Sequence, residues 1–198
     1  IMATSIVSIC NLALIRFGGG KITSLSDGSE TARLLNANYE NCLETVLRAF
    51  PWNFARKIEA LALTEDTTPG YDYCYAYPAN CAKALYIFDE DDINITERKE
   101  KPHIIFNGTA KILATNIEDA YIEYTYNVTT PTLYDPLFVK ALSYLLAAEV
   151  CNAKTGNAAK AQEMLQKYQL AILEAQHASA TENTNTVEWP SSWIKGRL

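Results

Sequence analysis

The spacing of apolar residues changes twice along this chain, and these changes constrain the fold more than any other feature. Up to about residue 50 the apolar positions recur every three or four residues. From about 58 to 127 they alternate with a period of two, and from 136 the helical spacing returns. The sequence therefore predicts a mainly α fold with an inserted antiparallel β meander, an α+β class whose core is a four-helix bundle.

Four helices are predicted, and they cover about 4–17, 29–49, 136–153 and 157–178. Asp27, followed three residues later by Glu30, has the spacing of a capping box before the second helix. Asp135-Pro136 is typical of a helix start, and Gly156 of a helix end. The third helix is apolar on nearly every side, which predicts that it lies at the centre of the fold or faces a second subunit.

The β region is rich in tyrosine and contains one strong turn signal. Strict alternation in YDYCYAYP predicts that Tyr71, Tyr73, Tyr75 and Tyr77 share one face of a strand. Asn107-Gly108 lies between two apolar runs and predicts a hairpin with positive φ at both residues. Residues 120–127 are expected to form the next strand of the same meander.

The chain is expected to form one domain over 1–180, followed by an extended, flexible tail over 181–198. Burying the two tail tryptophans is worth roughly 8–12 kcal/mol. Ordering ten residues costs on the order of 15 kcal/mol. We therefore expect the tail to become ordered only against a partner.

The charge distribution argues against nucleic-acid binding and against a membrane anchor. The 198 residues carry a net charge of −6, and the one dense basic run, Arg98, Lys99 and Lys101, follows an acidic run at 89–92. This pattern predicts a solvated charged loop rather than a phosphate-binding face. The first seventeen residues lack a basic leader and are too short to span a bilayer. The five scattered cysteines are expected to be reduced and mostly buried.

The motifs that could carry chemistry do not meet the requirements of a catalytic or cofactor site. FGGGKITS, residues 17–24, has a lysine after its glycines but lacks the hydroxyl residue next to Lys21 that a phosphate loop needs. His103 and His177 have no ligand spacing, and the acidic run at 89–92 lacks the alternating oxygens and glycine of a calcium loop. We expect no enzyme activity, no cofactor and no metal. The glycines are expected to end the first helix.

A series of short motifs runs through nearly the whole chain in a fixed order: ITSLSD at 22–27, Trp52 to Ala55 as W-x-F-A, Tyr-Ala-Tyr-Pro at 75–78, D-P-x-F at 135–138, and Ser192 to Arg197 as S-W-I-x-x-R. Their order and spacing resemble the head-to-tail adaptor of short-tailed bacteriophages, the tail tubular protein A family.

The resemblance implies a structural virion protein, assembled in the host cytoplasm. It implies a homo-oligomer, a dodecameric ring between the portal protein and the tail nozzle protein, through whose lumen DNA passes without specific binding. Portal contacts are expected from four tail residues: Trp189, Trp193, Ile194 and Arg197. Ring packing is expected from the last two helices, at Phe138, Leu142, Leu145, Leu146 and Tyr168.

Two other function classes remain open at this point. A tail-associated enzyme such as a cell-wall hydrolase would need converging carboxylates or a metal site, which sequence spacing alone does not display. A tail-associated protein-binding module would be a monomer that binds one partner through its tyrosine face or its tail. The resemblance favours the adaptor over both.

Overall fold

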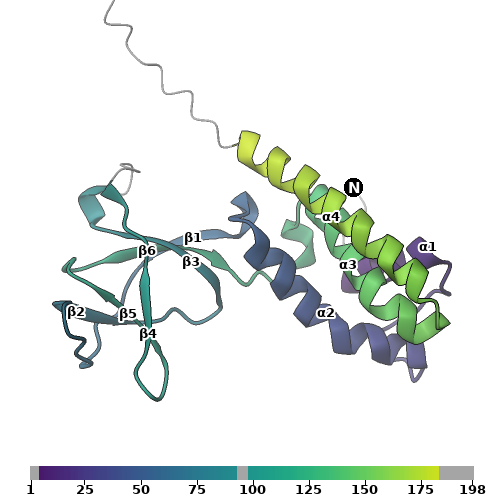
Figure 1. Ribbon diagram of the computed structural model, residues 1–198, viewed down its shortest axis with the longest axis horizontal. Helices are drawn as coiled ribbons and strands as arrows, with labels where there is room; N and C mark the ends of the chain where they lie inside the picture. The colour runs from purple at the N-terminus through teal and green to yellow at the C-terminus, as the bar shows by residue number, and fades with distance from the viewer. Residues whose placement is uncertain (1–4, 93–97, 183–198) are drawn as a thin grey trace, which may run out of the picture.

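The computed structural model describes residues 5–92 and 98–182, and over this part of the chain the α+β class is confirmed (Figure 1). The α-helices of the described residues are α1 (Ile6–Phe17), α2 (Glu30–Ala49), α3 (Pro136–Thr155) and α4 (Ala158–Glu182). The strands are β1 (Arg56–Ala60), β2 (Tyr73–Ala76), β3 (Cys81–Phe88), β4 (His103–Phe106), β5 (Lys111–Thr115) and β6 (Tyr121–Tyr126). These four α-helices lie at one end of the molecule and the strands at the other (Figure 1).

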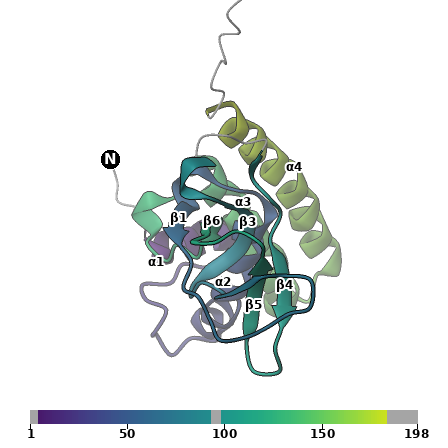
Figure 2. The ribbon, with the colours of Figure 1, turned by 90° about the vertical axis from the view of Figure 1, so that its left-hand side faces the viewer.

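The third helix, α3, lies at the centre of the helical part, as its apolar sequence predicts. It packs against α1, α2 and α4. Helices α1 and α4 both pack against α3, and they also contact each other. Figure 2, viewed from the end that holds the strands, shows the helices behind them.

The ends of the helices show which side chains satisfy their free backbone groups. The carboxylate of Asp135 accepts hydrogen bonds from the amides of Leu137 (2.7 Å) and Phe138 (3.2 Å), which confirms the predicted start of α3. Gly156 has φ 66° and ends α3 as expected.

The predicted cap of α2 is wrong. Ser29, not Asp27, is the N-cap, because its hydroxyl accepts from the Ala32 amide at 3.2 Å. The Asp27 carboxylate instead accepts from the amide (3.0 Å) and hydroxyl of Ser29, and so it orients the capping residue. Asp27 thus holds Ser29 in place, and Ser29 caps the helix.

The strands do not form one meander, which corrects the predicted topology. They form two three-stranded antiparallel sheets, one in the order β1-β6-β3 and one in the order β2-β5-β4. Ile122 and Tyr124 of β6 share a buried cluster with Leu113 of β5 and Tyr75 of β2. Strands β5 and β6 therefore meet face to face across a core instead of pairing edge to edge, because both have apolar side chains to bury.

The hairpin at Asn107-Gly108 joins β4 to β5, but its turn differs from the predicted two-residue type. The loop covers 107–110, and only Gly108 has positive φ (96°). The side-chain oxygen of Asn107 accepts from the amides of Thr109 (2.9 Å) and Ala110 (2.8 Å). Asparagine thus acts here through its side chain, as in an Asx turn.

The shared face of four tyrosines is confirmed for three of them. Tyr73, Tyr75 and Tyr77 belong to the cluster between the sheets. Tyr71 lies before β2 begins, packs against the cluster on the other face of its sheet, and stacks on His103 with ring centroids 4.8 Å apart. The alternation ends where the strand ends.

The segment between α2 and β1 attaches the sheets to the helices. Trp52 is 1% exposed, donates from Nε1 to the Val46 carbonyl at 2.8 Å, and meets the Phe138 ring edge-to-face at 5.1 Å. These contacts anchor the passage from helix to sheet in the core. Helix α4 ends nearby and continues to Glu182, four residues beyond the predicted end at 178.

Candidate functional site

The predicted portal-binding residues Trp189, Trp193, Ile194 and Arg197 lie outside the described residues. Of the predicted ring-packing residues, Phe138, Leu142, Leu145 and Leu146 are buried in the core of the chain itself, and Tyr168 is half-buried against that core. A fully buried side chain offers no surface to a second copy. Ring packing stays a prediction, and exposed residues of the helices would have to make it.

The glycine loop ends α1, as predicted, and is held against that helix. Gly18 has φ 79°, and the amides of Gly18 and Gly19 point back to the carbonyls of Ile15 (3.3 Å) and Leu14 (2.8 Å). The Asn11 side chain exchanges two hydrogen bonds with the backbone of Ile22, at 2.9 and 3.0 Å. The amides of Gly18, Gly19 and Ile22 therefore have partners within the chain and do not form a phosphate cradle.

The candidate acid-base and ligand side chains are dispersed. His103 stacks on Tyr71, and His177 is exposed on α4, more than one turn before the helix ends. Within residues 5–92 and 98–182, no group of three or more His, Cys, Asp or Glu side chains is placed to hold a metal ion. All five cysteines are free thiols, four of them buried, as predicted. Burial raises the pKa of Cys10 and of Cys42 to about 12.

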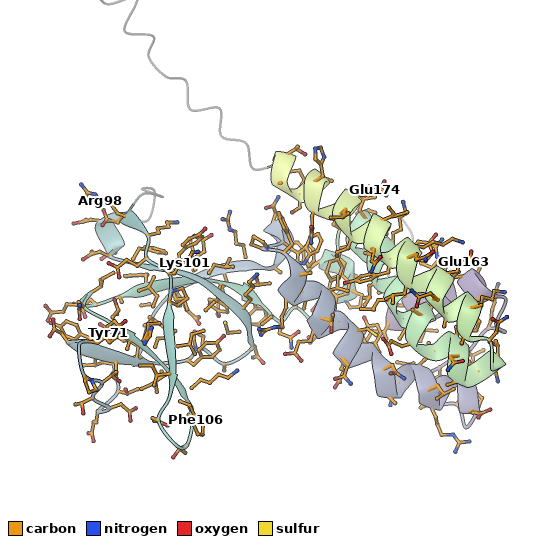
Figure 3. All side chains as sticks on the ribbon, viewed as in Figure 1. Tyr71, Arg98, Lys101, Phe106, Glu163 and Glu174 are labelled. Carbon is orange, nitrogen blue, oxygen red and sulfur yellow. The ribbon has the colours of Figure 1, made fainter. Side chains whose placement is uncertain are left out.

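The predicted solvated basic loop is only partly solvated. Arg98 is exposed and pairs with Asp92 at 3.0 Å (Figure 3). Lys99 turns inward and pairs with Glu123 at 2.8 Å, where Arg56 meets the other carboxylate oxygen at 2.5 Å. Glu123 is 2% exposed, so its charge needs these cations, and the three side chains attach the residues around Lys99 to the β1-β6-β3 sheet.

Two pairs of exposed apolar side chains lie on the outer faces of α1 and α4. Leu12 and Ile15 of α1 are 40% and 56% exposed, and Leu170 and Leu173 of α4 are 70% and 62% exposed. Ion pairs flank the α4 pair, with Lys167 on Glu163 and Lys140 on Glu174, each at 2.6 Å; the two glutamates mark this face in Figure 3. An apolar centre with a charged rim is the composition of a protein-binding surface.

A groove of about 280 Å³ lies where the helices meet the β1-β6-β3 sheet. Its apolar walls come from Phe54, Tyr126, Val128 and Leu133, and Leu133 is 57% exposed. Arg56 and Lys57 add two cations. The groove is close in size to the smallest ligand pockets, about 300 Å³, and suits one ring-sized side chain.

The exposed apolar pairs on α1 and α4 were not predicted from the sequence, because the predicted core faces of these helices are the inward ones. The signal was present, because Leu12, Ile15, Leu170 and Leu173 are large apolar residues that lie outside those faces. The groove left no such signal. Its walls come from two segments, 54–57 and 126–133, that only the tertiary fold brings together.

Comparisons with known proteins add no relative. No family model matches the chain, and no curated protein matches it either. None of the helices in the described part of the chain is long and apolar enough to cross a membrane.

Proposed function

We propose that this protein is a structural virion component, a head-to-tail adaptor that forms a ring between portal and tail and lets the genome pass. The observation that carries the proposal is the presence of exposed apolar side chains on two different helices, Leu12 and Ile15 on α1 and Leu170 and Leu173 on α4. A contact between unlike patches is heterologous: each copy leaves one patch of each kind free for the next copy, and the series closes into a ring if the rotation fits.

The motif series from residue 22 to residue 197 supports the same proposal. Within it, the helical part would act as a four-helix bundle that forms the wall of the ring, and the tail residues 183–198 would contact the portal. The tail nozzle protein would bind the other end, and the dodecameric copy number comes from the resemblance alone. The protein would then be found in the virion, after assembly in the host cytoplasm.

The net charge of −6 suits a channel through which DNA slides, because several converging cations are needed to hold duplex phosphates. Tight binding of duplex DNA by the isolated protein at physiological salt would count against this part of the proposal. The affinity for duplex DNA would be measured as a function of salt concentration.

Two single-patch variants test the ring contact. Ile15→Asp removes the α1 patch and Leu170→Asp removes the α4 patch, both at exposed positions, and Leu63→Asp, at a leucine 65% exposed before β2, is the matched control. With unlike patches in contact, each variant alone should stay monomeric under conditions in which the control assembles. Mixed together they should stop at dimers, because each variant retains the patch that the other has lost.

Other results would contradict this arrangement. If the α4 patch paired with itself, Ile15→Asp would assemble normally. If neither variant changed the assembly, the ring contact would lie elsewhere. The size distribution is measured by sedimentation velocity, with the portal added where the protein alone does not assemble.

A further inference from the structure

The groove between helices and sheet lies next to the point where the C-terminal segment leaves the described fold. Asn53 donates from Nδ2 to the carbonyl of Ser179 (2.8 Å) and to the carboxylate of Glu182 (3.1 Å). Phe54, the next residue after Asn53, forms one wall of the groove. Glu182, the last described residue, therefore lies close to the groove.

The chemistry of the groove matches one part of this segment. The groove combines the rings of Phe54 and Tyr126 with an exposed leucine and two cations. Arg56 and Lys99 share Glu123, and Lys57 pairs with Glu59 at 2.6 Å, so these five side chains together carry one more positive than negative charge. Residues 183–190 contain one charged residue, Glu188, and it directly precedes Trp189. An indole beside a carboxylate fits apolar walls with cations at the rim.

We propose that residues 183–190 fold back on their own chain and place Trp189 in this groove, with Glu188 toward Arg56 and Lys57. Seven residues lead from Glu182 to Trp189, and an extended chain of that length spans up to about 25 Å. The docked tail of the free protein is then an autoinhibited form, and a partner has to displace it before the two tryptophans of the tail bind elsewhere. The docking itself is independent of ring formation, whereas the displacement by a partner rests on the proposed portal contact of the tail.

The docked tail has a low loop-closure cost. A short connection between fixed ends gives a high effective concentration, so a weak contact between one ring and one groove is enough to populate the docked form. A partner that takes up both Trp189 and Trp193 competes with more contacts than the groove offers. The contact therefore delays partner binding without preventing it.

Tryptophan fluorescence of the full chain tests the proposal. The variant Trp193→Phe leaves Trp52 and Trp189, and Trp52 is 1% exposed and closed to acrylamide. Quenching then reports on Trp189. In the Trp193→Phe chain, a second substitution, Leu133→Asp, would place a carboxylate in the groove to repel Glu188. Leu133 is already 57% exposed, and Leu63→Asp is the matched control.

Leu133→Asp should raise the acrylamide quenching constant of Trp189 about fivefold, because a pocket removes about 70–90% of a ligand's exposed surface. Leu63→Asp should leave the constant unchanged, and Glu188→Lys should raise it partway. If Trp189 in the Trp193→Phe chain were quenched as readily as a free tryptophan derivative, the proposal would be overturned. If the protection of Trp189 from acrylamide fell on dilution, the groove would hold the tail of a second copy. That result would overturn docking within one chain.

Discussion

Asn53 and Glu182 lie 129 residues apart in the chain and are joined by a 3.1 Å hydrogen bond between Nδ2 and Oε2. This contact attaches the last turn of α4 to the segment that leads into β1. It holds the end of α4 beside the junction of helices and sheets.

Asn53→Ala should loosen the end of α4. The side chain makes two hydrogen bonds to this turn, so the loss should cost about 1–2 kcal/mol. Amide hydrogen exchange should accelerate at residues 176–182 and stay unchanged in α1. Asn36→Ala, on the exposed face of α2, is the control. Equal exchange in both variants would show that the contact does not hold this turn.

The glycines after α1 should differ in their tolerance of alanine. Gly18 has φ 79°, so Gly18→Ala should lower the free energy of unfolding by about 1 kcal/mol. A Cβ on Gly19 would lie 3.0 Å from side-chain atoms of Leu14 and Phe17, which must shift. Gly20 has no heavy atom within 4 Å of the added Cβ and no left-handed φ, so Gly20→Ala should be neutral or slightly stabilising.

Urea denaturation of these three variants provides the measurement. The expected order of stability is Gly20→Ala above both Gly18→Ala and Gly19→Ala. A loss at Gly20 as large as that at Gly18 would mean that the loop needs glycine for a reason other than backbone conformation and close packing.

Glu123→Gln should be strongly destabilising. The glutamine is of similar size but carries no charge, and it leaves Arg56 and a nearly buried Lys99 without their anion. Breaking a buried ion pair at one partner costs about 3–5 kcal/mol. Thermal unfolding followed by circular dichroism measures the loss. Glu163→Gln, in an exposed pair on α4, serves as the control and should leave the midpoint unchanged.

Cys10 and Cys42 should resist alkylation in the folded protein. Burial raises the pKa of each thiol from 9.0 to about 12, so at pH 8 the reactive thiolate is about 1,000-fold scarcer than in the unfolded chain. Mass spectrometry after iodoacetamide should find half-buried Cys81 labelled first. Labelling of Cys10 as fast as Cys81 would contradict the buried assignment.

The same pKa shifts make stability depend on pH in a defined window. Because the folded-state pKa is the higher one, the unfolded chain releases these two protons first as pH rises. The contribution of the thiols is fully present below about pH 9 and is lost progressively between about pH 9 and pH 12. Replacing both cysteines with alanine should flatten the pH dependence in this range.

The helices could be predicted from the sequence because their signals are local. The three-to-four residue spacing, Asp135 before Pro136, and Gly156 each act within one or two turns, and the structure places helix ends within a few residues of the prediction. The predicted N-cap of α2 was wrong because two possible capping residues, Asp27 and Ser29, lie two positions apart. Both are good capping residues, and only the backbone geometry selects between them.

The arrangement of the strands could not be predicted in the same way. A meander follows if each strand pairs with the next one, but β6 pairs with β1 and β3, which lie far away in the sequence. The inward turn of Lys99 has the same cause. Its partner Glu123 is 24 residues away on the central strand of a sheet, so a run of charges that looks solvated in sequence contains one member that turns inward.

The rotational symmetry of the assembled particle tests the central claim most directly. We would measure it in averaged electron micrographs of the full-length chain, alone and mixed with the portal. The account predicts a closed ring in which neighbouring copies meet through α1 and α4, and twelvefold symmetry if the resemblance holds in full. Single copies, isologous dimers or open filaments, with no closed ring on the portal, would contradict it.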